Sequence, residues 1–199
     1  MLKTVKIISM AIILSGFATT SNAQIFGYDG VKHSDIKEFV KWDSVLNKFN
    51  SELSNNDAGL QAMRNGIAKT ANMKPADKIK AVNDFVNNSI SYSPDSMVYG
   101  KSDYWAAPGE TFARGEGDCD DYAIAKFFAL RMLGFQENDM RIVILHDSRK
   151  NQIHAVLSIN HGGKNYILDN QSEYVVEDTQ ISYYKPIYSI SENGYWTHS

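Results

Sequence analysis

Residues 119–133 place the strongest constraint on the fold, because this segment is apolar on almost every side of a helix. Its apolar residues are Ala123, Ile124, Ala125, Phe127, Phe128, Ala129, Leu130, Met132 and Leu133. A helix that is apolar all round has to be covered on all sides by other elements. Gly134 follows directly and suits the left-handed position that ends many helices. We therefore expect one buried helix at the centre of the molecule.

Further helices are predicted before this segment. Apolar residues recur at helical spacing over residues 34–53, with Ser34 as the candidate N-cap, and a weaker pattern covers residues 57–70. A third helix is expected to open at Pro75. Between residues 91 and 118, prolines, glycines and aromatics interrupt the pattern, which predicts a long structured loop of the kind that often carries function.

Strands are predicted after the central helix, over residues 140–145, 152–160 and 164–169. Residues 183–199 are expected to add one or two edge strands. Helices followed by a run of strands predict an α+β fold, in which an antiparallel sheet packs on the buried helix.

Composition excludes several classes of protein. With 20 Lys and Arg against 23 Asp and Glu in 199 residues, the chain has a net charge of −3 and no basic tract, so nucleic acid is not expected as a partner. A single cysteine cannot form an intramolecular disulfide or a zinc cluster of several thiolates. Cys119 is therefore structural, idle or reactive.

Residues 1–23 have the three parts of a secretory signal peptide. Lys3 and Lys6 precede an apolar run over residues 7–18, and Ser21 and Ala23 stand at the third and first positions before the expected cut. The run is shorter than the roughly 20 residues that cross a bilayer, which disfavours an uncleaved membrane anchor. We expect a single exported domain over residues 24–199, with no membrane insertion after cleavage.

Cys119 starts the buried helix, where free backbone N–H groups and the helix dipole favour a thiolate. If Gly162 and Gly163 form a two-residue hairpin turn, Asp169 lies opposite Val156 and diagonal to His154 on the same face. The register thus allows a relay in which Asp169 orients His154 and His154 activates Cys119. Taken singly, such a cysteine or histidine is more often structural, but the combination in an exported chain favours catalysis.

Four segments together resemble the bacterial transglutaminase-like cysteine proteinases of the LapG type. They are residues 103–108 (DYWAAP), 115–126 (GEGDCDDYAIAK), 154–157 (HAVL) and 168–170 (LDN). The resemblance covers roughly residues 94–171. It implies a papain-like or transglutaminase-like core with Cys119, His154 and Asp169 as the catalytic triad, and a thiol protease of the periplasm.

The same resemblance implies a protein substrate and a regulator. Proteases of this type cut a large secreted adhesin near its N-terminus and so control biofilm attachment. They are inhibited by an inner-membrane receptor that responds to cyclic di-GMP. We expect an adhesin and a receptor of this kind as partners.

Asp118, Asp120 and Asp121 surround the cysteine and disfavour its ionisation unless a cation offsets them. Asp118 also suits the helix N-cap, which would explain it without a metal. Hard oxygen ligands on a turn fit Ca²⁺, and the resemblance likewise implies calcium held by acids beside the cysteine. The residue after the cysteine is Asp120 where a longer Glu is common in the family, so the coordination is expected to differ.

For the oxyanion, the backbone N–H of Cys119 and the indole N–H of Trp105 are the candidate donors, although a loop tryptophan more often packs beneath its loop. Two other functions stay open. The same site is able to transfer the acyl group to an amine, as a transglutaminase-like acyl transferase or amidase, or the chain is a non-catalytic binding module of the same fold.

Overall fold

A computed structural model describes residues 24–199. The predicted signal peptide, residues 1–23, lies outside the described residues. The helices are α1 (Val40–Ser54), α2 (Ala58–Ala68), α3 (Pro75–Ser89), α4 (Asp95–Val98), α5 (Pro108–Arg114) and α6 (Cys119–Met132). Short 3₁₀ turns cover Glu137–Asp139 and Asp178–Gln180. No helix among the described residues is long and apolar enough to cross a membrane.

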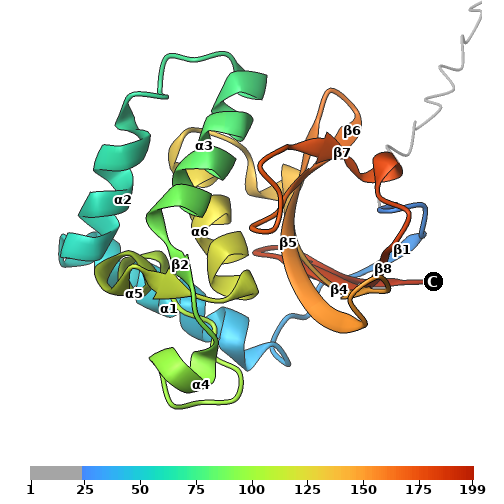
Figure 1. The fold of residues 1–199 in the computed structure, drawn as a ribbon, viewed down its shortest axis with the longest axis horizontal. Helices are drawn as coiled ribbons and strands as arrows, with labels where there is room; N and C mark the ends of the chain where they lie inside the picture. The colour runs from blue at the N-terminus through green and yellow to red at the C-terminus, as the bar shows by residue number, and fades with distance from the viewer. Residues whose placement is uncertain (1–23) are drawn as a thin grey trace, which may run out of the picture.

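Nine strands are found in this part of the chain. They are β1 (Gly30–His33), β2 (Ser91–Tyr92), β3 (Glu116–Gly117), β4 (Met140–Asp147), β5 (Gln152–His161), β6 (Lys164–Leu168), β7 (Val176–Glu177), β8 (Tyr184–Ser191) and β9 (Gly194–His198). Seven of them form one antiparallel sheet in the order β1-β9-β8-β4-β5-β6-β7, while β2 and β3 pair in parallel. The sheet curls strongly and the helices gather on one side of it (Figure 1).

Helix α6 lies between the other helices and β5, as its apolar pattern predicts (Figure 1). Phe127, Phe128 and Leu130 are fully buried in the main core together with residues of α1, α2, α3, β4 and β5. A second core on the other face of the sheet contains Val143 and Val156. The mixed fold with an antiparallel sheet on a buried helix confirms the predicted α+β class.

The first helix begins at Val40, so the prediction of a helix from Ser34 is wrong over its first six residues. Two local hydrogen bonds explain the difference, because the Asp35 carboxylate accepts from the backbone N–H of Lys37 at 3.1 Å and the N–H of Phe39 donates to the carbonyl of Ile36 at 2.9 Å. These turn contacts compete with helical hydrogen bonding.

The region between residues 91 and 118 contains α4, α5, β2 and β3, so the prediction of a long loop is wrong for most of it. The proline and glycine that suggested a break are the two ends of α5. Pro108 stands at its first turn, and Gly115 ends it with a positive φ of 69°. Proline at the start and glycine past the end are signals of a helix as much as of a loop.

The C-terminal strands are internal to the sheet rather than at its edge, which corrects the sequence-based expectation. β8 lies between β9 and β4, and β9 pairs with β1. The edge beyond β9 is instead formed by the short strand β1, which was not predicted from the sequence. β4 pairs with β5 on one side and with β8 on the other.

Candidate active site

The start of α6 is fixed by acidic side chains. The backbone N–H of Asp118 donates to Asp121 Oδ2 at 3.3 Å, and the N–H of Ala106 donates to Asp121 Oδ1 at 2.8 Å. Gly117 permits this approach, since a Cβ there would lie 2.7 Å from Asp121 Oδ2. The first residue of the helix is Cys119, so the cap itself sets the position of the thiol.

The Cys119 thiol lies beside β5, facing the backbone N–H groups of Ala155 and Asp120. Burial raises its pKa to about 12, with further contributions from the Asp120 and Asp118 carboxylates, while the two N–H groups act in the opposite direction. The start of the helix was expected to favour the thiolate. In the structure burial and the acids outweigh that effect, so the thiol needs positive charge nearby to ionise at neutral pH.

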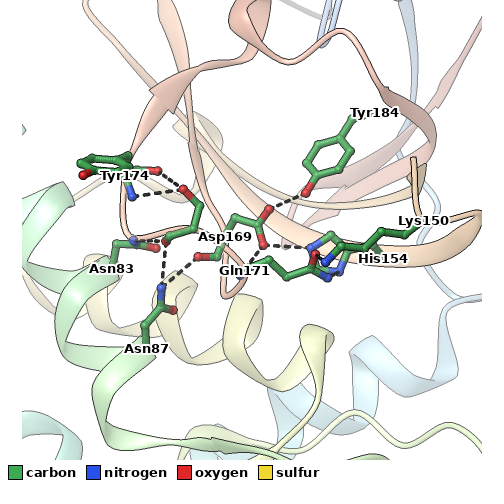
Figure 2. Close-up of polar contacts among 9 residues, drawn as sticks. Asn83, Asn87, Lys150, His154, Asp169, Gln171, Tyr174 and Tyr184 are labelled. Atoms are coloured by element: carbon green, nitrogen blue, oxygen red, sulfur yellow. Dashed lines mark hydrogen bonds and ion pairs between the residues drawn. The ribbon is translucent and has the colours of Figure 1, made fainter. Parts of the chain in front are cut away.

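The hairpin of β5 and β6 has the register that the sequence predicts, with His161 opposite Lys164 and Leu157 opposite Leu168. It brings His154 Nε2 to 2.9 Å from Asp169 Oδ1 (Figure 2). His154 is only 1% exposed and Asp169 only 5%. The two side chains therefore form a buried pair, and the hydrogen bonds of the described residues include none between Cys119 Sγ and the imidazole.

Asp169 receives further hydrogen bonds that keep it ionised. The Tyr184 hydroxyl donates to Oδ2 at 2.5 Å and the backbone N–H of Gln171 donates to Oδ1 at 2.9 Å (Figure 2). Burial alone would raise the pKa of Asp169, but the contacts with His154, Tyr184 and Gln171 outweigh it and hold the pKa below its ordinary value. The carboxylate is thus an acceptor for His154 at neutral pH.

Two asparagines of α3 hold the loop that carries Asp169. Asn87 Nδ2 donates to the Asp169 carbonyl at 2.9 Å, and Asn83 Nδ2 donates to the Ser172 carbonyl at 3.2 Å (Figure 2). The sequence reasoning did not identify these asparagines, Gln171 or Tyr184. The amide-rich polar face of α3 was a signal for the asparagines, whereas nothing local in the sequence relates Tyr184 to Asp169.

Carboxylates gather at the start of α6. One oxygen each of Asp95, Asp118 and Asp121 lies within 4.8 Å of the others, and Oδ1 of Asp95 and of Asp118 is buried without a hydrogen-bonding protein partner. Burial is the largest cause that raises the pKa of Asp118 to about 6 and of Asp121 to about 8. Such a set of hard, crowded oxygen donors suits a cation such as Ca²⁺.

The sequence proposed Asp118, Asp120 and Asp121 as metal ligands, and the structure brings the first and third together with Asp95. Asp95 begins α4, in the region expected to be a loop, and sequence reasoning missed it. Asp120 lies outside this group of three. It is 9% exposed, its Oδ1 has no protein partner, and burial followed by the charges of Asp118 and Asp121 raises its pKa.

Trp105 lies in the main core and is 4% exposed. Its ring meets the Trp42 ring edge-on, with centroids 6.3 Å apart, and the Lys41 ammonium lies 5.4 Å from its centroid. The side chain thus packs beneath the segment that leads to α5. The oxyanion roles of its indole N–H and of the Cys119 backbone N–H stay predictions.

Comparison with known proteins places this geometry in a family context. Residues 48–198 match the family described as bacterial transglutaminase-like cysteine proteinase, BTLCP. LapG of Legionella pneumophila is 28% identical with a TM-score of 0.61, over 78% of this chain and 86% of that one. The EGTA-treated form of the same protein is 28% identical with a TM-score of 0.62, over 79% of this chain and 85% of that one. Its calcium-bound form is 28% identical with a TM-score of 0.61, over 76% of this chain and 86% of that one. No curated protein sequence is similar enough to count as a relative.

Proposed function

Because the chain belongs to the bacterial transglutaminase-like cysteine proteinases, we propose that it cleaves peptide bonds with Cys119, His154 and Asp169. The single observation that carries this assignment is the buried His154–Asp169 hydrogen bond of 2.9 Å, formed on a hairpin beside the helix that starts with Cys119. A base oriented by a carboxylate next to the only thiol of the chain is the arrangement that nucleophilic catalysis needs.

In the proposed reaction, Cys119 Sγ attacks the carbonyl carbon of the peptide and its proton passes to His154. His154 then gives this proton to the leaving amine, and the C–N bond breaks to leave a thioester on Cys119. Water attacks the thioester, His154 takes a proton from the water and returns one to sulfur, and the carboxylic acid leaves. Asp169 holds Nε2 of the imidazole throughout, so Nδ1 is the nitrogen that carries these protons.

We propose that this reaction depends on calcium held by Asp95, Asp118 and Asp121. The support comes from the buried, unpartnered oxygens of Asp95 and Asp118 and from the calcium-bound and EGTA-treated structures of LapG. When bound, the ion would supply positive charge beside the thiol and lower its pKa toward neutrality.

The proposed substrate is a secreted adhesin, cut near its N-terminus after export of the enzyme to the periplasm, with release controlled by an inner-membrane cyclic di-GMP receptor. Only the likeness of the family motifs supports these partners.

The test uses residues 24–199 and the N-terminal region of a secreted adhesin from the same cell. We expect cleavage by the wild type in CaCl₂, no cleavage by Cys119→Ala, and loss of activity in EGTA that added CaCl₂ restores. Asp95→Asn should need at least tenfold more calcium, whereas Asp77→Asn, at an exposed acid of α3, should behave as wild type. Equal cleavage by Cys119→Ala would refute the triad, and full activity in EGTA would refute the calcium dependence.

A further inference from the structure

His154 is covered by side chains that belong to two different turns. Gln171 lies two residues after Asp169, and Lys150 lies in the turn between β4 and β5. Both are exposed, whereas His154 is buried. Gln171 Nε2 lies 3.3 Å from His154 Nδ1, and Lys150 Nζ donates to Gln171 Oε1 (Figure 2). The amide of Gln171 thus bridges the imidazole and an ammonium group at the surface.

The donor and acceptor groups determine which end of the Gln171 amide faces His154. Asp169 is ionised and can only accept, so His154 Nε2 must carry the hydrogen that faces it. Lys150 can only donate, so the oxygen of the Gln171 amide faces Lys150 and its NH₂ group faces Nδ1. Nδ1 is therefore an unprotonated acceptor in this arrangement.

This arrangement offers no acceptor for a hydrogen on Nδ1. If Nδ1 received the proton of Cys119, its N–H would face the NH₂ group of Gln171 and two donors would meet. The amide is unable to turn its oxygen inward without giving up Lys150. A proton on Nδ1 therefore requires that the Gln171 amide gives up Lys150 and turns over, or that the side chain moves away.

We propose that Gln171 is a positioning residue whose NH₂ group occupies Nδ1 of His154 in the resting enzyme, and that this amide has to turn over or leave before the catalytic pair forms. The inference rests on the proposed triad. It explains why the imidazole is 1% exposed although it must reach a leaving amine, since the flexible, exposed Gln171 side chain can uncover it.

The other charged and titratable groups around His154 do not remove this constraint. Asp169 at the end of β6 occupies Nε2, and Tyr184 of β8 binds Asp169 with its ring centroid 5.9 Å from that of the imidazole. From α6, Cys119 lies against the neighbouring residue Ala155, and Lys126 acts on Asp169. Among the described residues, the only hydrogen-bonding partner of Nδ1 is the Gln171 amide, which Lys150 holds from behind.

The test measures alkylation of the single cysteine by iodoacetamide at pH 6 in residues 24–199 with CaCl₂. Gln171→Leu removes the donor that faces Nδ1. We expect the alkylation rate to rise between about twofold and tenfold, which is the size of effect expected when one hydrogen bond is lost. Gln171→Glu replaces the donor by an acceptor, so its rate should rise further. Gln136→Leu, at an exposed glutamine that bonds only to a nearby carbonyl, should match wild type.

Histidine ¹⁵N spectra at pH 7 provide a second readout that does not depend on the thiol. We expect an unprotonated Nδ1 of His154 in the wild type and a protonated one in Gln171→Glu. A merely structural role for Gln171 predicts slower alkylation in both variants; that result, or unchanged rates and spectra, would overturn the proposal. His154→Asn separates the proposed triad from the proposed role of Gln171. Unchanged alkylation of Cys119 in His154→Asn refutes the triad. Loss of alkylation in His154→Asn, together with unchanged alkylation in the Gln171 variants, refutes only the role of Gln171.

Discussion

Replacing Lys126 by Met is expected to stabilise the protein, although Lys126 lies at its centre. The side chain is 0% exposed, and its Nζ has no hydrogen-bonding partner among the described residues. Lys126 sits two turns of α6 after Cys119, and Asp169 is the charged group that acts on it. An ammonium group in such a position is costly because it loses its hydration without gaining a direct ion pair.

The size of the effect follows from proton affinities. Burial lowers the pKa of Lys126 from 10.5 to about 7, and the charge of Asp169 only partly opposes this. The unfolded chain binds this proton below pH 10.5, whereas the folded chain binds it only below pH 7. Stability is therefore lost as the pH falls from 10.5 to 7, by about 1.4 kcal/mol per pH unit, which gives about 4 to 5 kcal/mol below pH 7.

Met has a similar length and no charge, so Lys126→Met should recover a large part of this free energy. We expect the variant to be at least about 2 kcal/mol more stable than wild type at pH 7, with the gap closing toward pH 10. Urea unfolding of both proteins at pH 7 and pH 9.5 measures the difference, since the titrations of other groups cancel between them. A variant that is less stable at pH 7, or a gap that widens with pH, would refute the reasoning.

Two further substitutions test contacts that hold the site. Tyr184→Phe removes the hydroxyl that donates to Asp169 Oδ2 at 2.5 Å. Because a hydrogen bond to a charged group is lost, peptidase assays should show a kcat/KM about tenfold lower, while the circular dichroism spectrum stays unchanged. Unchanged kinetics would exclude a role for this hydroxyl. Gly59→Ala places a Cβ 2.0 Å from the Gly109 carbonyl oxygen where α2 meets α5, so urea unfolding should show a loss of at least about 2 kcal/mol. A stability equal to wild type would contradict this packing.

The parts of the site that follow local rules could be predicted from sequence. The turn at Gly162 and Gly163 sets the register of β5 and β6, and the register alone brings His154 and Asp169 together. The buried helix is likewise evident from its own residues. In both cases the residues that determine the structure lie within about 20 positions of one another in the sequence, where periodicity and turn chemistry are informative.

The other parts depend on chain segments that meet only in the folded protein. Tyr184 reaches Asp169 because β8 pairs with β4 rather than lying at the edge, which no local pattern specifies. Asp95 meets Asp118 and Asp121 because β2 pairs with β3 and brings α4 beside the start of α6. Sequence reasoning missed α5 because proline and glycine occur both at helix ends and in loops.

Two sets of contacts near Cys119 both act against its ionisation. In the first set, burial and the Asp120 and Asp118 carboxylates raise the pKa of the thiol, and Asp95 and Asp118 leave buried oxygens without a protein partner, which a cation can bind. In the second set, Asp169 occupies Nε2 of His154 and the Gln171 amide occupies Nδ1. A thiol with a raised pKa and a base with an occupied nitrogen both oppose formation of the thiolate–imidazolium pair. Under the two proposals, activation requires positive charge at the acids and release of Gln171, so calcium should speed Cys119 alkylation more in Gln171→Leu than in wild type.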